Sequence, residues 1–260
     1  NTKGPIRIGG HKINDYRNNG PELPVWEVIT ESSNLGTARI AKMIGPEKQR
    51  EFLSSLGFSK PTTIEMIEAN GGKPLLPKRW NELETMTISY GHGLSATPLH
   101  LATGYATLAN GGRLVNPTLL QEVKPVLGPR VISKEVAENS LAMLRGVVTG
   151  GTASLADVDG YFVGGKTGTA DKPSSQGGYD KEKNITNFAS IFPINEPKYV
   201  LVVTLDEAQD TSGPEPKRTA GWTAVPVSAE IIARVAPLLG LRPKFDNHST
   251  IGITLSNWQE

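Results

Sequence analysis

Cysteine is absent from the 260 residues of this chain. The chain therefore forms no disulfide and offers no thiolate, and its redox compartment stays undecided. An excess of charge of one sign is also lacking, because 27 lysines and arginines are balanced by 26 aspartates and glutamates. The net charge of +1 and the scattered basic residues provide no field that would attract nucleic acid.

Long apolar runs and metal-binding motifs are missing as well. The best apolar run, YVLVVTL at Tyr199–Leu205, is far too short to cross a membrane and is typical of a buried strand. The histidines show no metal-ligand spacing and no HExxH motif occurs; they are His11, His92, His100 and His248. We therefore expect no metal site.

Apolar residues make up 37% of the chain, which is enough for a sizeable core. Their spacing predicts helices over residues 35–44, 46–57, 98–112 and 133–154. Pro98 suits the first turn of a helix, and Gly111-Gly112 suits a helix end. Residues 1–24 are predicted as loop with one short strand, and residues 62–80 as loop.

The pattern changes after residue 158. Three strands are predicted over residues 161–170, 187–194 and 198–206, with a polar loop at 171–184 and a hairpin turn in NEPK at 195–198. A last helix is predicted over residues 224–240, and no prediction is made for the tail up to Glu260. Helices followed by an antiparallel meander and a terminal helix indicate an α+β domain with helices packed on a sheet.

The stretch YFVGGKTGTADK, residues 161–172, places a lysine and two threonines on a glycine-rich predicted strand. Glycine on a strand usually marks a bulge or a place where another backbone comes close, and here an extended peptide-like ligand is one such backbone. Lys166 would then supply a positive charge, and the hydroxyls of Thr167 and Thr169 would donate to a carboxylate. A backbone N–H near Thr169 would face a developing oxyanion. The alternative is a solvated edge strand with a surface lysine.

The triplet Ser32-Ser33-Asn34 has the form S-x-N and lies just before a predicted helix, or at a break between two helices. A hydroxyl and an amide two residues apart can point to one side of a turn. The hydroxyl of Ser32 would then relay a proton, and the amide of Asn34 would hold a peptide carbonyl. The alternative is a helix N-cap, for which serine and asparagine are favoured residues.

S-x-N followed by K-T-G is part of the motif set of penicillin-binding proteins and class A β-lactamases. Together with SYGHGLSATPLHLATGYATLANGG, VVTGGTA and FPINEPKYVLVVTLDE, these motifs resemble the transpeptidase domain of class B penicillin-binding proteins, in particular the members that act in cell division. The resemblance runs from about Asp15 to Leu241. It implies the penicillin-binding-protein and β-lactamase-like α+β fold, with an antiparallel sheet flanked by helices and its N-terminal part outside this chain.

The resemblance also implies how the chain is organised and where it acts. Residues 1–260 would be the C-terminal part of a single transpeptidase domain, with a helical half at about 15–150 and the strands and terminal helix at about 158–241. A membrane anchor and a non-catalytic domain would precede it, on the periplasmic face of the inner membrane. Implied partners are peptidoglycan stem peptides, β-lactams and, through the parent chain, membrane proteins of the division machinery.

The family cross-links peptidoglycan through a serine acyl-enzyme, and its functional residues can be carried over to matching positions. Ser32 would shuttle a proton to the leaving amine, and Lys166 would lower the local potential and keep Ser32 hydrogen-bonded. Asn34 would hold an amide of the substrate. Thr167, Gly168 and Thr169 would form the binding strand, with both hydroxyls on the terminal carboxylate and the N–H of Thr169 as one oxyanion donor. No metal or organic cofactor is implied, since covalent serine catalysis needs none.

The sequence departs from the family at its first motif, S-x-x-K, which carries the nucleophilic serine and its lysine. No serine of this chain is followed three residues later by a lysine. In the family this motif precedes S-x-N by a few dozen residues, which places it before Asn1. Because the chain starts in mid-pattern with NTKGPIRIGG, we interpret it as a fragment of an active enzyme rather than a pseudoenzyme. We expect such a fragment to persist only with the missing N-terminal segment docked on it non-covalently.

The sequence is therefore compatible with three alternative functions. The first is a D,D-transpeptidase of septal wall synthesis that β-lactams target. The second is a catalytically dead penicillin-binding fold that serves as a division scaffold. The third is a D,D-carboxypeptidase or β-lactamase, in which the acyl-enzyme ends in hydrolysis.

Overall fold

The computed structural model describes residues 1–121, 126 and 128–245. These residues belong to two compact units, one ending at Ser133 and the other beginning at Lys134. The first unit is mainly helical, and the second holds a three-stranded antiparallel sheet with helices packed on it. The predicted α+β fold is therefore confirmed. The organisation into one transpeptidase domain with a boundary near residue 150 stays a prediction, and the tail from residue 246 lies outside the described residues.

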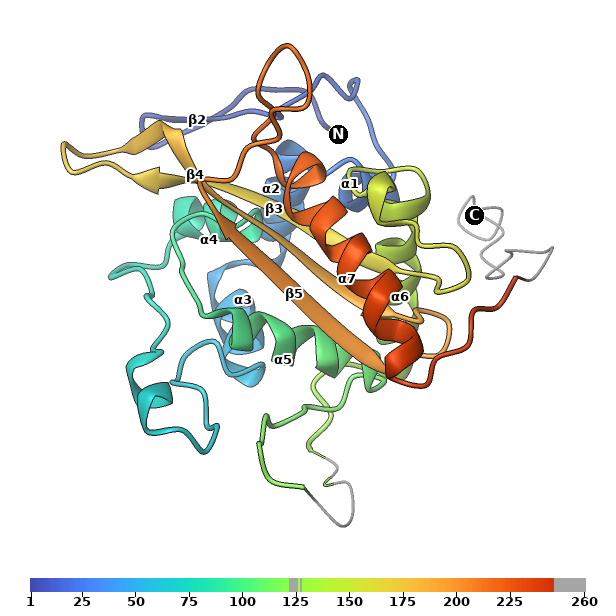
Figure 1. Ribbon diagram of the computed structural model, residues 1–260. Coiled ribbons are helices and arrows are strands. Elements are labelled where there is room, and N and C mark those ends of the chain that lie inside the picture. The colour runs from blue at the N-terminus through green and yellow to red at the C-terminus, as the bar shows by residue number, and fades with distance from the viewer. Residues whose placement is uncertain (122–125, 127, 246–260) are drawn as a thin grey trace. The chain divides into compact units, whose positions relative to one another are not determined.

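The first unit contains a short hairpin and a group of helices (Figure 1). Helices α2 and α4 pack against each other, and a buried cluster of Ile13, Leu35, Ala38 and Met86 joins them to the hairpin. The elements are β1 (Ile6–Ile8), β2 (His11–Ile13), α1 (Val25–Thr30), α2 (Asn34–Ile44), α3 (Pro46–Ser55), the 3-10 helix η1 (Ile67–Gly71), α4 (Glu82–Ser89) and α5 (Pro98–Ala109).

Of the two positions predicted for the S-x-N triplet, the start of this unit confirms the break between two helices. α1 ends at Thr30 and α2 begins at Asn34, so the S-x-N triplet lies at a break between two helices. The break forms because Ser32 adopts the left-handed conformation, with φ 57°, and Ser33 then caps α2. Residues 1–24 hold two short strands where one was expected, and η1 lies inside the predicted loop at 62–80.

Helix α4 was not predicted, although its start carries a clear local signal. The side chain of Asn81 accepts from Leu83 N, and the side chain of Glu84 accepts from Asn81 N, which is the reciprocal bonding of a capping box. The helix has only eight residues and buries Thr85 as well as Met86 and Ile88. A buried threonine weakens the apolar period on which a helix prediction depends.

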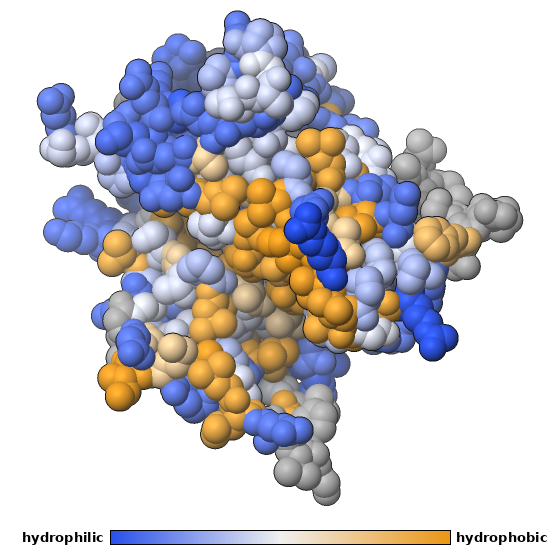
Figure 2. All heavy atoms as spheres, in the orientation of Figure 1, coloured by the Kyte–Doolittle hydropathy of each residue, from blue (hydrophilic) through white to orange (hydrophobic). Residues whose placement is uncertain are grey.

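The second unit is built on the sheet β3-β4-β5, in which neighbouring strands are antiparallel. Helix α6 packs on β3, and α7 packs on β5 and β4 (Figure 1). Figure 2 shows apolar side chains along α7 and β5, and the exposed ones on α7 include Val227 and Leu238. The elements are α6 (Lys134–Thr149), η2 (Ser154–Ala156), β3 (Gly164–Pro173), β4 (Tyr179–Phe192), β5 (Tyr199–Asp206), η3 (Ala220–Trp222) and α7 (Ala224–Leu238).

The predicted polar loop at 171–184 is wrong, because most of it forms strand. β3 continues to Pro173 and β4 begins at Tyr179, with the register shifting between Asp171 and Lys172. Both faces of this extension are largely polar, so it shows none of the apolar alternation that predicts a strand. Lys172 Nζ holds it to the end of β5, lying 2.5 Å from Asp206 Oδ1 and 2.7 Å from Glu207 Oε1.

Candidate active site

The paired glycines at the start of β3 allow two neighbouring backbones to come close. A Cβ on Gly164 would lie 3.1 Å from the backbone nitrogen of Arg145, on α6. A Cβ on Gly165 would lie 2.5 Å from the carbonyl oxygen of Ala189, on β4. Both distances are shorter than ordinary van der Waals contacts, and a Cβ on Gly164 would also lie 2.6 Å from Ile194 Cδ1. The glycines therefore serve the packing of the strand between a helix and its sheet neighbour.

The close approach of α6 brings a third threonine to the K-T-G residues. Thr152, in the turn after α6, places its Oγ1 atom 2.7 Å from Thr167 Oγ1. Lys166 Nζ donates to the carbonyl oxygen of Thr167 at 3.1 Å and lies 3.4 Å from Thr167 Oγ1. Desolvation by burial lowers the pKa of Lys166 from 10.5 to about 8, because the charged amine is the form that loses hydration. Lys166 is therefore still mostly charged at neutral pH, beside two hydroxyls.

Thr169 is supported by a segment 51 residues further along the chain. Its Oγ1 atom accepts a hydrogen bond of 3.0 Å from the backbone N–H of Ala220, the first residue of η3. The next residue, Gly221, lies against Thr152, since a Cβ there would be 2.9 Å from the carbonyl oxygen of Thr152. Three chain segments, around residues 152, 166–169 and 220–221, therefore meet at one place in the second unit.

This arrangement has the groups that a carboxylate-bearing, extended ligand would require. Among the described residues β3 is an outer strand of its sheet, with β4 on one side. The free side of an outer strand offers backbone N–H and C=O groups to an added peptide strand. A lysine ammonium and two threonine hydroxyls are donors suited to a carboxylate, and bonds to a charged acceptor are stronger than neutral ones. That these groups bind the carboxylate of a peptide-like ligand stays a prediction.

The S-x-N triplet has its own support in the first unit, centred on Asp15. Ser33 Oγ donates to Asp15 Oδ2, and the backbone N–H of Leu35 donates to Asp15 Oδ1, both at 2.8 Å. Asn34 Nδ2 donates to the carbonyl oxygen of Asn14 at 3.1 Å. Ser33 takes the N-cap role, so the capping alternative applies to the middle residue of the triplet. Ser32 is left in a strained left-handed conformation, of the kind found often at functional sites.

The predicted residues thus fall into two groups. Lys166, Thr167, Gly168 and Thr169 share one strand of the second unit, whereas Ser32 and Asn34 belong to the first unit. Their joint action stays a prediction.

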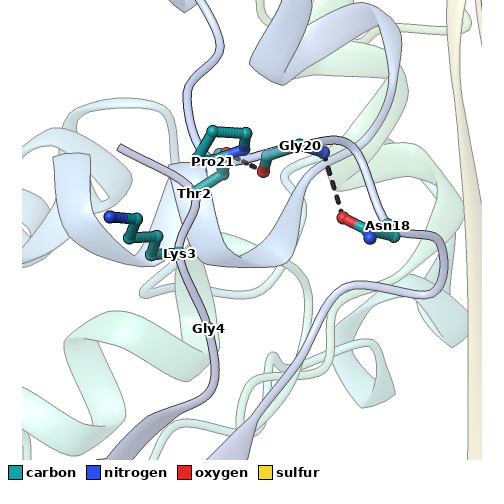
Figure 3. A pocket seen from close by; sticks show the side chains of 6 residues that line it. All are labelled: Thr2, Lys3, Gly4, Asn18, Gly20 and Pro21. Carbon is teal, nitrogen blue, oxygen red and sulfur yellow. Dashed lines mark hydrogen bonds between the residues drawn. The ribbon is translucent and has the colours of Figure 1, made fainter.

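A hollow of about 310 Å³ occurs elsewhere in the first unit and contains none of these residues (Figure 3). It is lined by Thr2, Lys3, Gly4, Asn18, Gly20 and Pro21. Figure 3 shows Asn18 accepting from the N–H of Gly20, at 3.1 Å, so this wall of the hollow is held by the loop itself.

Among the described residues no group of three or more metal-ligand side chains could hold an ion. Across the same residues, no helix combines the length and the apolar character that a bilayer span requires.

Sequence reasoning missed three supporting residues: Asp15, Thr152 and Ala220. Asp15 stands outside the S-x-N motif, and its contacts to Ser33 and Leu35 join residues 18 and 20 positions apart. Thr152 lies in the segment VVTGGTA, which belongs to the family motifs, but the sequence does not indicate its contact with Thr167. Ala220 acts through its backbone N–H, which no side-chain pattern can indicate.

Comparison with known proteins assigns the class of this domain. A family model described as the penicillin binding protein transpeptidase domain matches residues 1–232. The chain belongs to this family, and the resemblance noted in its motifs is confirmed.

Among curated proteins, the chain is 33% identical over 252 residues to the probable peptidoglycan D,D-transpeptidase FtsI of Caulobacter vibrioides. It is 32% identical over 241 residues to the peptidoglycan D,D-transpeptidase FtsI of Escherichia coli. Each match covers 92% of this chain but only 42% and 40% of the relatives. The chain therefore spans about two fifths of the length of these relatives.

Solved structures agree with this assignment. The transpeptidase domain of penicillin-binding protein 3 from Burkholderia pseudomallei superposes with a TM-score of 0.83 at 33% identity, covering 94% of this chain and 72% of that one. Penicillin-binding protein 3 from Mycobacterium tuberculosis, in complex with ampicillin, superposes with a TM-score of 0.81 at 27% identity. That match covers 95% of this chain and 58% of the other.

Proposed function

We propose that this chain is the substrate-binding part of a serine-type peptidoglycan D,D-transpeptidase that acts in septal cell-wall synthesis and is a target of penicillins. Membership of the transpeptidase family and the likeness to FtsI proteins support the reaction class. The observation that carries the proposal is the cluster on β3, where Lys166, Thr167 and Thr169 offer one cation and two hydroxyls beside a free strand edge.

In the proposed reaction a serine hydroxyl attacks the carbonyl carbon of the penultimate D-alanine of a stem peptide. The peptide C–N bond breaks, the last D-alanine leaves as an amine, and an ester to the serine remains. An amine of a neighbouring stem then attacks this ester, forms the new peptide bond and returns the serine hydroxyl. The nucleophile belongs to an S-x-x-K motif that these 260 residues do not contain.

The residues of this chain are assigned binding and proton-transfer roles. Ser32 delivers a proton to the leaving amine, and Asn34 holds an amide of the stem peptide. Thr167 and Thr169 donate their hydroxyl protons to the terminal carboxylate, which a penicillin carboxylate imitates. The charge of Lys166 favours the same anion, and the N–H of Thr169 stabilises the developing oxyanion. Gly168 leaves this part of the strand without a side chain, where a Cβ would lie 2.7 Å from Asn187 Oδ1.

The proposal extends to the location and partners of the parent protein. We assign it to the periplasmic face of the inner membrane, with an N-terminal anchor and a contact to division proteins outside these residues. A segment of the parent chain is proposed to dock on the helical unit, where single apolar side chains such as Met43 and Ile67 are 86% and 90% exposed. Expression of the 260 residues alone tests this docking. A compact monomer that melts cooperatively would contradict it.

The function itself is tested by the intact mass of the full-length protein before and after a labelled penicillin. We expect one penicillin adduct, on a serine of an S-x-x-K motif outside this chain. An adduct on a serine within the 260 residues would show that the nucleophile is misplaced. A full-length protein that forms no adduct would favour the scaffold alternative. Rapid hydrolysis of the adduct would favour the carboxypeptidase or β-lactamase alternative over the transpeptidase.

A further inference from the structure

The segment around η3 is bonded to both members of one strand pair. Thr169 on β3 and Thr186 on β4 are directly opposite in the antiparallel register. Ala220 N–H donates to Thr169 Oγ1, while Thr223 Oγ1 lies 3.0 Å from Thr186 Oγ1. Thr186 is fully buried and Thr223 is 5% exposed, so the second bond is shielded from water.

A third bond holds the same segment at its start. Asn184 Nδ2, on β4, donates to the carbonyl oxygen of Arg218 at 3.0 Å, and Asn184 is 3% exposed. Residues 218–223, which we call the η3 clamp, are therefore fixed to β4 at both ends and to β3 in the middle. Most buried polar groups in folded proteins are hydrogen-bonded, and the buried Asn184 amide and Thr186 hydroxyl find their partners in this segment.

The middle bond restricts how Thr169 can use its hydroxyl. A threonine hydroxyl has one hydrogen to donate and two lone pairs that accept. The Ala220 N–H occupies one lone-pair direction of Thr169 Oγ1, and the hydroxyl hydrogen must point away from that N–H. The hydroxyl proton is therefore confined to the two remaining staggered positions and is available to an acceptor other than the η3 backbone.

We propose that the η3 clamp presents the hydroxyl proton of Thr169 to a ligand carboxylate, and that Ala220, through its N–H, and Thr223 are positioning residues for this recognition. The inference rests on the proposed function, in which Thr169 binds the carboxylate of a stem peptide or a penicillin. It adds that recognition depends on a segment distant in sequence that does not itself touch the ligand. The packing of Gly221 against Thr152 seats the same clamp beside the support of Thr167.

The test compares two probes on the full-length protein: benzylpenicillin, which has a free carboxylate, and its methyl ester, which has none. The rate of acylation is measured for both, and the readout is the ratio of the two rates. Thr223→Val removes the hydroxyl that holds the clamp, and Thr223→Ser, which keeps a hydroxyl, is its matched control. Ala220→Pro removes the N–H, and Ala220→Ser, which keeps it, is the second control.

We expect Thr223→Val and Ala220→Pro to lower the carboxylate-to-ester ratio about tenfold, as suits the loss of one aligned bond to a charged group. Both serine variants should stay near the wild-type ratio. Equal losses with both probes would show a purely structural role and overturn the inference, and so would an unchanged ratio in Thr223→Val. A wild-type protein that reacts with neither probe would overturn the proposed function as well. Failure of the proposed function is thus distinguished from failure of the positioning role alone.

Discussion

Gly165 is a position at which one added methyl group should disturb the packing of β3 against β4. A Cβ there would lie 2.5 Å from Ala189 O and 2.7 Å from Phe188 Cζ. Such pairs normally stay about 3.5 Å apart, so β3 and β4 would have to separate by about 1 Å. Neither neighbour yields easily, since one is a backbone carbonyl and the other is a fully buried ring. Overpacking of this kind costs about 1–3 kcal/mol of unfolding free energy.

We therefore expect Gly165→Ala, in the full-length protein, to lower the Tm of the transpeptidase domain by about 2–10 °C in calorimetry. Gly150→Ala is the matched control, because a Cβ at Gly150 would meet nothing within 4 Å. Its free energy of unfolding should stay within about 0.5 kcal/mol of wild type. A Gly165→Ala protein that melts at the wild-type temperature would refute the packing argument, and so would an equal loss in the control.

Three further predictions concern the pH dependence and the supports of the two motifs. Because burial lowers the pKa of Lys166 to about 8, the charged amine destabilises the native state fully below that pH, and stability returns as the pH rises from about 8 to 10.5. Lys166→Met should therefore gain most in urea midpoint over wild type at about pH 7 and less at about pH 9.5; Lys172→Met, which removes a lysine whose pKa is raised by Asp206, should show no such gain. Asp15→Ala removes the acceptor of two bonds at the start of α2 and should lower the unfolding free energy by about 1–3 kcal/mol in urea titration, and an unchanged midpoint would contradict this role. Thr152→Val removes the hydroxyl bonded to Thr167 and should slow acylation by benzylpenicillin about tenfold. Thr152→Ser keeps a hydroxyl and should react at the wild-type rate. Equal rates in the two variants would show that this hydroxyl contact does not affect acylation.

The sequence predicted those elements whose apolar pattern is strong and failed where polar residues form regular structure. The buried part of β4, residues 188–192, and the helices with a clear apolar face, such as α2, follow directly from their apolar pattern. α4 and the tip of the β3–β4 hairpin do not, because a capping box and ion pairs to Lys172 hold them. These interactions depend on geometry that alternation of residue types does not record.

The site divides in the same way. Lys166, Thr167 and Thr169 were found because the K-T-G motif places them together on one strand. Ala220 escaped notice because it lies 51 residues from Thr169 and contributes only a backbone N–H. Supports that act across a fold, from the backbone or from a distant turn, become visible only when the chain is folded. The motif therefore identified the groups that would touch a ligand, and the structure added the groups that hold them.

The glycines of β3 allow close packing against α6, and the hydroxyls of β3 make their contacts beside this packing. Thr152 Oγ1 meets Thr167 Oγ1 at 2.7 Å in the turn that follows α6. The same strand packs close to α6 at Gly164, where a Cβ would lie 2.6 Å from Ile194 Cδ1 and 3.1 Å from the backbone nitrogen of Arg145. A side chain at Gly164 would therefore crowd both Ile194 and the helix that leads to Thr152. Close packing of the glycine-rich strand thus accompanies the contact between the hydroxyls on which carboxylate binding would depend.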